Sequence, residues 1–407
     1  MEVKARSAGM LQAPCWRKFV PFSHIKTVMS HTKPQSTSSP MALKGENLYL
    51  LQLTASNTMV VALLLGLFIY VSAVTALDFS NAKWIWKDHD ESLPVGELGD
   101  LRYDFSPEPG KIAAAAQILI AGDDKYTLWV NGEYIGQAAG WPQGHLYCVT
   151  LNPGRNTFAA EVENQVANTP AALISAIQIT YTDTSTQTVV TDGGCCANNA
   201  IPGFQDPGYN DAGWPNAVAL GSANSAPWHT PALPPPASSV TLDTSSWIWT
   251  NEVTSPGGNA PVGHRAFRKT INIPGRVAAR TGSIIIDTDN GYTLYINGNM
   301  IGQGGDWQQA QRWAFKFDYP TDEIVIAVDC VNTGGPAGLI ATVVLDVSNF
   351  YCSTYSVYVT DNSWKYSLSV PADFELPDYD DSDWPNAIVE GPYGMSPWGK
   401  VPIVNGN

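Results

Sequence analysis

The stretch YTLWVNGEYIGQ, from Tyr126 to Gln137, decides the fold, because it returns 166 residues later as YTLYINGNMIGQ, from Tyr292 to Gln303. In both copies, apolar and polar residues alternate on either side of an Asn-Gly pair. This pattern is the strongest local signal for two antiparallel strands joined by a two-residue type I′ turn. Each copy therefore predicts a β-hairpin, and the repetition predicts a duplicated unit.

The repetition extends well beyond the hairpin. Asp123 and Trp141 recur 166 positions later as Asp289 and Trp307, and the sequences WIW and WPNA also occur twice. The offset between matching positions drifts only from 163 to 170, which requires a few loop insertions and no rearrangement. A unit of roughly 150 to 160 residues is too long for a solenoid repeat and suits a whole domain. The chain is therefore predicted to hold two copies of one domain.

Short alternating runs such as QILIAGD and SIIIDTD are separated by turn residues, and no long stretch has helical periodicity. This organisation is typical of antiparallel β-sandwiches. The prolines of PALPPPASS, at 231–239, cannot join a central strand and favour an extended spacer. We therefore predict an all-β protein with one sandwich over 77–230, a Pro-rich linker over 231–242 and a second sandwich over 243–407.

The N-terminus follows different rules. Residues 1–58 carry seven Lys or Arg and two Glu without periodicity, so we expect a disordered extension or a misassigned gene start. Residues 59–76, MVVALLLGLFIYVSAVTA, form an apolar run that ends in small residues. This run suits a cleaved signal peptide, with the mature chain starting near Leu77, or a signal anchor that spans the membrane. Both interpretations place the sandwiches outside the cell, as a secreted or a membrane-anchored protein.

Net charge narrows the range of partners. Without the first 76 residues, which hold 7 basic and 2 acidic side chains, the chain keeps 15 basic and 35 acidic residues, a net charge of about −20. Such a charge disfavours nucleic acids and anionic membrane surfaces. A neutral ligand such as a glycan or polysaccharide is easier to accommodate. Contact with a membrane is expected only through residues 59–76, if they are not cleaved.

Five cysteines follow the apolar run, and their spacing matches no zinc motif, so a metal site is not specified. In an oxidising compartment some of them should pair. We predict a disulfide between Cys330 and Cys352, inside the second copy. For Cys148 two alternative disulfide partners stay open, Cys195 and Cys196.

Several of these segments resemble a known family: AGDDKYTLWVNGEYIG, DTDNGYTLYINGNMIG, NTGGPAGLIA and the DDSDWPNA turn before PW. They are similar to the galactose-binding-like jelly-roll modules of glycoside hydrolases, in particular the sugar-binding modules of bacterial α-L-rhamnosidases. The resemblance covers nearly the whole exported chain, twice. It implies two sandwiches whose end loops hold a saccharide, in some relatives with calcium, which is therefore a candidate cofactor. One departure is that Trp364 in the second copy is Cys195 in the first, so the copies are expected to differ in ligand or competence.

A site for a neutral sugar needs an aromatic surface for the C–H face of the ring, beside carboxylates and amides that bond its hydroxyls. Trp141 and Trp307 lie in Gly-rich loops after the hairpin, where they either pack on the loop or form a sugar platform. The acidic and amide residues that precede the signature strand are either sugar ligands or ordinary turn residues. The predicted sugar-binding set is Asp123, Asp124, Trp141, Asp289, Asn290, Gln303, Trp307 and Asn332.

Other prominent residues are assigned to structure. Eight tryptophans in recurring pairs are predicted to be core: Trp84, Trp86, Trp214, Trp228, Trp247, Trp249, Trp384 and Trp398. The acidic string around Asp381 has one recurring carboxylate, at Asp211 in the first copy, so it predicts a turn or cap and not a calcium loop.

Catalysis has little support in the sequence. No pair of carboxylates stands out in both copies, and Ser396 is not in a Gly-x-Ser-x-Gly elbow. The two units fill 80–230 and 243–403, so we expect no catalytic barrel among them. The leading hypothesis is an extracellular, lectin-like protein with two non-catalytic sugar-binding modules. The alternatives are an adhesive surface protein that binds another protein and an enzyme related to glycoside hydrolases.

Overall fold

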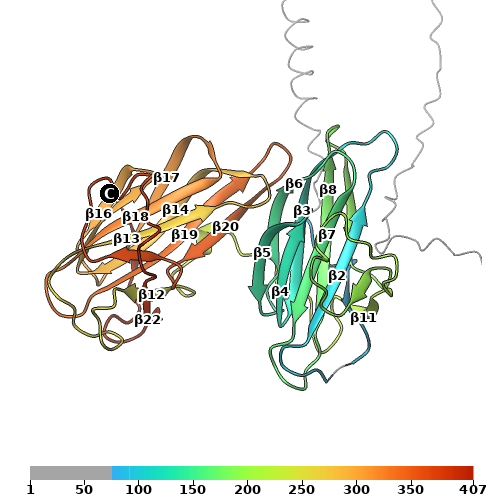
Figure 1. Ribbon diagram of the computed structural model, residues 1–407, viewed down its shortest axis with the longest axis horizontal. Helices are drawn as coiled ribbons and strands as arrows, with labels where there is room; N and C mark the ends of the chain where they lie inside the picture. The colour runs from blue at the N-terminus through green and yellow to red at the C-terminus, as the bar shows by residue number, and fades with distance from the viewer. Residues whose placement is uncertain (1–75, 91, 407) are drawn as a thin grey trace, which may run out of the picture. The chain divides into compact units, whose positions relative to one another are not determined.

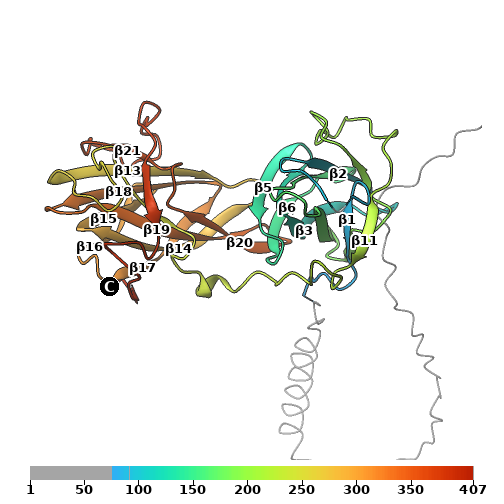
Figure 2. The same cartoon turned by 90° about the horizontal axis from the view of Figure 1, so that it is seen from below.

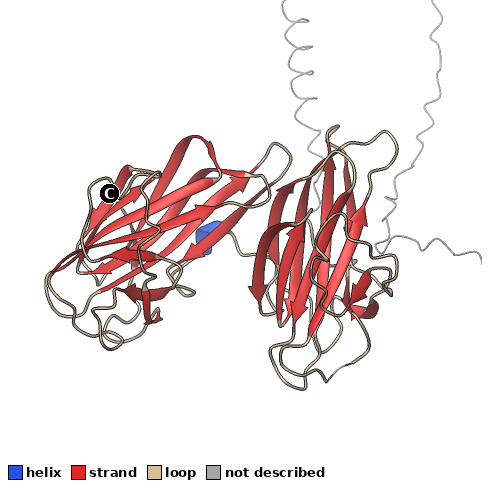
Figure 3. Cartoon of the chain, viewed as in Figure 1, coloured by secondary structure: helices blue, strands red, loops and turns tan. Residues whose placement is uncertain are grey.

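The computed structural model describes residues 76–90 and 92–406, which form two β-sandwiches (Figure 1). Strands dominate, and the short 3-10 helix η1 (Ala237–Ser239) lies in the linker (Figure 3). Residues 1–58, and 59–75 of the predicted signal or anchor segment, lie outside the described residues. Within the described part, no helix has the length and apolarity needed to cross a membrane. The all-β fold predicted from the sequence is confirmed.

The first sandwich consists of two sheets. The larger has the order β11-β1-β8-β3-β6, with β9 beside β8, and the smaller has the order β10-β2-β7-β4-β5. The strands of the larger sheet are β1 (Lys83–Trp86), β3 (Ala113–Asp123), β6 (His145–Thr150), β8 (Ala172–Tyr181), β9 (Thr186–Val190) and β11 (Val218–Ser222). Those of the smaller sheet are β2 (Leu98–Phe105), β4 (Lys125–Val130), β5 (Glu133–Ala139), β7 (Asn156–Glu163) and β10 (Cys196–Asn198).

The second sandwich repeats this topology, with the orders β22-β12-β19-β14-β17-β23 and β16-β15-β18-β13-β21, and with β20 beside β19. The larger sheet contains β12 (Ser246–Trp249), β14 (Ala278–Asp289), β17 (Ala310–Thr321), β19 (Gly338–Ser348), β20 (Ser353–Val359), β22 (Ile388–Pro392) and β23 (Ile403–Asn405). The smaller sheet contains β13 (Gly263–Asn272), β15 (Gly291–Ile296), β16 (Asn299–Gly304), β18 (Glu323–Asn332) and β21 (Lys365–Ser367). Each sandwich is built from one continuous stretch of chain, as the colours show (Figure 2).

The signature hairpins form as predicted, β4 with β5 and β15 with β16. Their turn residues have positive φ in both copies: 55° at Asn131 and 83° at Gly132, then 46° at Asn297 and 77° at Gly298. Positive φ at both central positions is the requirement of a type I′ turn, which Asn and Gly meet with the least steric cost. The local sequence therefore fixes both hairpins.

The core of each sandwich lies between its two sheets. Trp86 and Trp249 are completely buried there, in equivalent positions on β1 and β12. Trp364 is also buried in the second core, and the residue in its place in the first, Cys195, is buried in the first core. The exchange of tryptophan for cysteine is therefore a difference in core packing, and it gives no ground for a difference in ligand.

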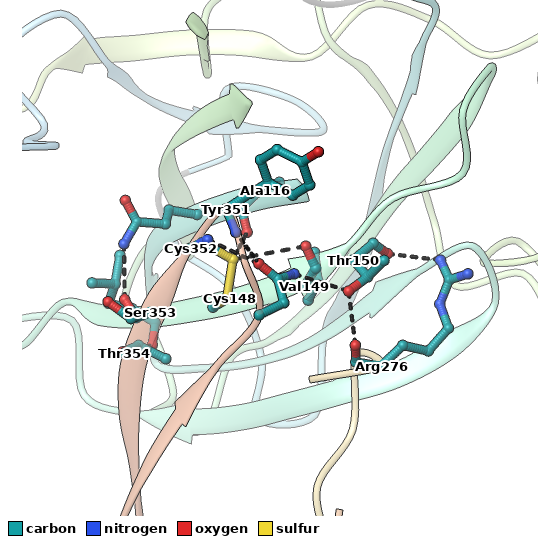
Figure 4. The surroundings of a disulfide bond; sticks show 12 residues. Ala116, Cys148, Val149, Thr150, Arg276, Tyr351, Cys352, Ser353 and Thr354 are labelled. Atoms are coloured by element: carbon teal, nitrogen blue, oxygen red, sulfur yellow. Dashed lines mark hydrogen bonds between the residues drawn. A yellow bond between two sulfur atoms is a disulfide. The ribbon is translucent and has the colours of Figure 1, made fainter. Parts of the chain in front are cut away.

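The predicted Cys330–Cys352 disulfide is wrong. Cys352 is bonded to Cys148 on β6 of the first sandwich, with a Cα–Cα distance of 5.8 Å and a sequence separation of 204 (Figure 4). Cys330 is free and completely buried in the core, because alternation along β18 points its side chain inward. Since Cys148 is taken by Cys352, neither Cys195 nor Cys196 is its partner. The bond therefore joins the two sandwiches to each other.

Hydrogen bonds surround this disulfide and join the same two sandwiches. The Thr150 hydroxyl donates to the Arg276 carbonyl over 2.7 Å (Figure 4). It also accepts from the Asn349 amide over 2.9 Å. The Thr354 hydroxyl donates to the Leu146 carbonyl over 3.0 Å. The sandwiches are thus linked covalently and by polar contacts, in addition to the extended spacer that the Pro-rich sequence predicted.

Candidate functional site

One end of each sandwich gathers most of the predicted sugar-binding residues. The long strand β3 ends at Asp123, and its equivalent β14 ends at Asp289. Both side chains are buried, and each accepts a hydrogen bond from an indole N–H, from Trp228 over 2.7 Å and from Trp398 over 2.9 Å. The peptide bonds that follow, to Asp124 and to Asn290, are both cis. We call this repeated arrangement the Asp–Trp corner.

The tryptophans of the corner are held by a second ring. Trp228 stacks on Trp84 with ring centres 5.1 Å apart, and Trp398 stacks on Trp247 at 4.3 Å. All four are buried, which confirms their assignment to the structure. Trp228 and Trp398 also orient the buried carboxylate, a role that the sequence did not reveal, because 105 residues separate Asp123 from Trp228.

The residue after each aspartate organises a neighbouring loop. Asp124 Oδ2 accepts hydrogen bonds from the backbone N–H groups of Gln165 and Val166, over 2.7 and 3.0 Å. Asn290 Oδ1 accepts from the N–H and the hydroxyl of Thr333, over 2.7 and 2.9 Å. These side chains therefore shape the rim of the corner.

The predicted platform tryptophans are both half-buried. Trp141 has its ring centre 6.5 Å from that of His229, at an angle of 55°. Trp307 packs on the cluster that contains Trp247 and Trp398, so part of its ring belongs to a small core and part faces solvent. The sequence left open whether Trp307 packs on its loop or forms a sugar platform. In the structure it packs on the loop and also exposes one edge to solvent.

Two members of the predicted set do not form part of the Asp–Trp corner. Asn332 is completely buried, and its amide donates to the carbonyls of Ala260 and Pro261 over 2.8 and 3.3 Å. Asn164 of the first sandwich anchors its loop in the same way. The prediction that Asn332 contacts sugar is therefore replaced by a role as a loop anchor. Gln303 is exposed and lies on the smaller sheet.

Burial dominates the electrostatics of the corner. It raises the pKa of Asp123 from 3.8 to about 7, although the bond from Trp228 acts in the opposite direction. Burial also raises the pKa of Asp289. The second sandwich adds two buried acids, because burial raises the pKa of Asp287 to about 8 and that of Glu390 to about 7.

These two added acids distinguish the sandwiches. Asp287 and Glu390 stand where the first sandwich has Ala121 and Leu220. Neither acid was predicted from the sequence. A signal that could have revealed them is that each aligns with an apolar residue of the other copy. The two corners therefore differ electrostatically at Asp287 and Glu390, in addition to the exchange of Asp124 for Asn290.

The acidic string before Trp384 is structural, as predicted. Its recurring carboxylate, Asp381, lies 3.1 Å from Nε of the buried Arg268, and Asp211 lies 3.0 Å from Nε of Arg102 in the first sandwich. Among the described residues, no group of three or more His, Cys, Asp or Glu side chains is placed to hold a metal ion.

Comparisons with known proteins show similarity to sugar-related proteins in sequence and in structure. No protein-family model matches the sequence. An α-L-rhamnosidase of Streptomyces avermitilis is 31% identical over 196 residues, which cover 46% of this chain and 18% of the enzyme. A lectin from Pleurotus ostreatus, solved in complex with GalNAc, is 34% identical; the match covers 81% of this chain and 96% of the lectin, with a TM-score of 0.40. A solved S. avermitilis α-L-rhamnosidase complexed with L-rhamnose is 16% identical over 81% of this chain and 33% of the enzyme, with a TM-score of 0.36.

The duplicated sandwich and its repeated corner define the class of protein: a tandem β-sandwich protein with a polar site at the end loops of each sandwich. The chain resembles the galactose-binding-like jelly-roll modules related to domains of the α-L-rhamnosidases. It spans less than a fifth of the length of the curated rhamnosidase that it matches.

Proposed function

We propose that this protein is a lectin-like carbohydrate-binding protein, in which both sandwiches bind neutral saccharides at their Asp–Trp corners without catalysing a reaction. The main support is that both sandwiches place equivalent residues at the same end of the fold. These are a carboxylate bonded by an indole N–H, an Asp or Asn that shapes the adjacent loop, and a half-buried tryptophan. An aromatic edge beside hydrogen-bonding groups suits the two faces of a sugar ring.

Sequence similarity supports this proposal. The identity of 34% to the Pleurotus ostreatus lectin extends over nearly all of that protein, and its solved complex contains GalNAc. By contrast, the match to the curated rhamnosidase is confined to 18% of the enzyme. The corner carboxylates accept hydrogen bonds from indole N–H groups, and Asp124 accepts them from backbone N–H groups, so these side chains are held in fixed positions beside the loops.

Calcium remains part of the proposal. Asp123 with Asp124 in the first sandwich, and Asp289 in the second, are the side chains that would hold it, because Asn290 Oδ1 already accepts two hydrogen bonds from Thr333. Since no group of three suitable side chains occurs among the described residues, the remaining ligands would be backbone or sugar oxygens, which calcium accepts. A bound ion would supply a fixed positive charge toward sugar hydroxyls.

An extracellular location is also proposed. The Cys148–Cys352 bond is a structural disulfide between two sandwiches, and such bonds persist mainly in oxidising compartments. N-terminal sequencing of protein recovered from the medium tests the prediction that the mature chain starts near Leu77. Recovery of the uncleaved chain only in membranes would favour the anchor.

A glycan array with the full chain, followed by calorimetry with GalNAc and L-rhamnose, tests the function. We expect saturable binding that is unaffected by salt, because the ligand is neutral. Repeating the titration with EGTA and then with excess calcium tests the ion. Failure to bind any glycan on the array would overturn the proposal, and release of sugar from chromogenic glycosides would favour an enzyme.

A further inference from the structure

A polar pocket of about 340 Å³ lies on the outer face of the smaller sheet in the second sandwich. Gln303, Thr293 and Asp329 form a row across β16, β15 and β18, because Thr293 pairs with both of the others. His264, on β13, places its Nδ1 2.8 Å from Oδ1 of Asp329. All four residues line the pocket. We call them the sheet-face row.

The sheet-face row points to solvent because of strand alternation. Leu294 and Val328, the neighbours of Thr293 and Asp329, are buried in the core, so the row faces the other way. Farther along the same face, Phe374 of the C-terminal segment packs with the buried Ala327. The pocket is therefore a part of the sheet face that this segment leaves uncovered. Its row lies on the smaller sheet, whereas Asp289 of the Asp–Trp corner ends a strand of the larger sheet. The two adjoin where the Asn290 N–H donates to the carbonyl of Val331, which lines the pocket.

The first sandwich contains a related row, with Glu161 in place of Asp329 and Leu98 in place of His264, and an ion pair lies at its margin. Lys125 and Glu163 form an ion pair there, with Nζ 3.0 Å from Oε2. The corresponding residues of the second sandwich are Gly291 and Val331, which carry no charge. The replacement of a lysine by a glycine leaves room beside the row in the second sandwich. The row of the first sandwich consists of Gln137, Thr127 and Glu161.

We propose that this pocket is a second saccharide site, which binds one neutral monosaccharide unit and occurs in the second sandwich alone. The inference rests on the proposed carbohydrate-binding function. Amide and hydroxyl groups donate and accept hydrogen bonds, the carboxylate accepts them and the imidazole donates, so the row matches hydroxyls that do both. No Lys or Arg lines the pocket, and Asp329 disfavours an anion.

Size also fits this class of ligand. Sites for small molecules typically have about 300–1,000 Å³, so a pocket near the lower limit suits a single sugar ring. Gln303, the last residue of the repeated hairpin, is therefore assigned a role on the face of the smaller sheet and not in the end loops.

The test is calorimetry on the full chain with GalNAc and L-rhamnose, using the variants Gln303→Ala and Asp329→Asn. Each variant should lower the affinity of one of the saccharide sites by about ten-fold or more, which corresponds to the loss of about 1.4 kcal/mol of binding free energy. His264→Leu, which introduces the residue of Leu98 in the first sandwich, should act in the same direction. Gln137→Ala is the matched control and should leave binding unchanged.

Thermal melts of each variant show whether it is folded, and Asp329→Asn changes neither size nor backbone. If the wild-type chain binds sugar and the sheet-face variants keep its stoichiometry and affinity, the second site is refuted and the proposed function stands. If the wild-type chain binds no saccharide, the proposed function fails, and the second site fails with it. Loss of one site in Gln303→Ala and Asp329→Asn, with Gln137→Ala unaffected, supports the proposal.

Discussion

Replacement of Trp398 by phenylalanine tests the energetic role of the Asp–Trp corner. Phenylalanine keeps a ring to stack on Trp247, whose centre lies 4.3 Å away, but it lacks the N–H that bonds Asp289 over 2.9 Å. Because Asp289 is only 5% exposed, water replaces this donor poorly. The unpaired carboxyl should cost about 1–3 kcal/mol, and the smaller ring about 1 kcal/mol more. We expect the free energy of unfolding to fall by about 2–4 kcal/mol in total.

Urea denaturation of the full chain, with the disulfide intact, measures this loss. A double-mutant cycle that combines Trp398→Phe with Asp289→Ala isolates the bond, and we expect a coupling energy of about 1 kcal/mol or more. Trp228→Phe is the matched change in the first sandwich, where the bond to Asp123 has a length of 2.7 Å. A coupling energy near zero in both sandwiches would show that the indoles do not hold these carboxylates.

Burial and covalent linkage lead to three further predictions. Burial raises the pKa of Asp100 from 3.8 to about 7, so the folded chain binds this proton more tightly and stability falls as pH rises between these values. Asp100→Ala, which introduces the residue of Ala266 in the second sandwich, should reduce that fall in thermal melts. Replacing both Cys148 and Cys352 by serine should lower stability by about 2–5 kcal/mol in chemical denaturation. Trp307→Ala should weaken GalNAc binding by about 1–3 kcal/mol in calorimetry.

Each of these predictions has a control or a contradicting result. An Asp100→Ala variant with the pH dependence of the wild type would show that folding does not raise the pKa of Asp100. Denaturation of the wild type under reducing conditions should reproduce the double serine variant. Trp249→Ala, in the core, should cost about 3–5 kcal/mol of stability. If Trp307→Ala lowers the melting temperature as far and leaves affinity unchanged, Trp307 belongs to the core alone.

Local signals predicted the hairpins and the buried tryptophans well. Asn-Gly restricts the backbone to a type I′ turn, and WIW in a strand places large apolar rings where only a core can accept them. The same reasoning placed Asp123 and Asp289 at the entry to the signature strand, where both are found. It failed for Asn332, because a sequence shows an amide but not whether its partners are hydroxyls of a ligand or the carbonyls of Ala260 and Pro261.

The sequence by itself determined that the chain contains two copies of one β-sandwich, because alternation, turn residues and repetition act through neighbours along the chain. Only the tertiary structure decided which distant groups meet. It paired Cys148 with Cys352 across 204 residues, and it set the indole of Trp228 on Asp123. Such contacts depend on how strands are ordered within sheets and on which face each side chain occupies, and a linear pattern does not specify the partner across that space.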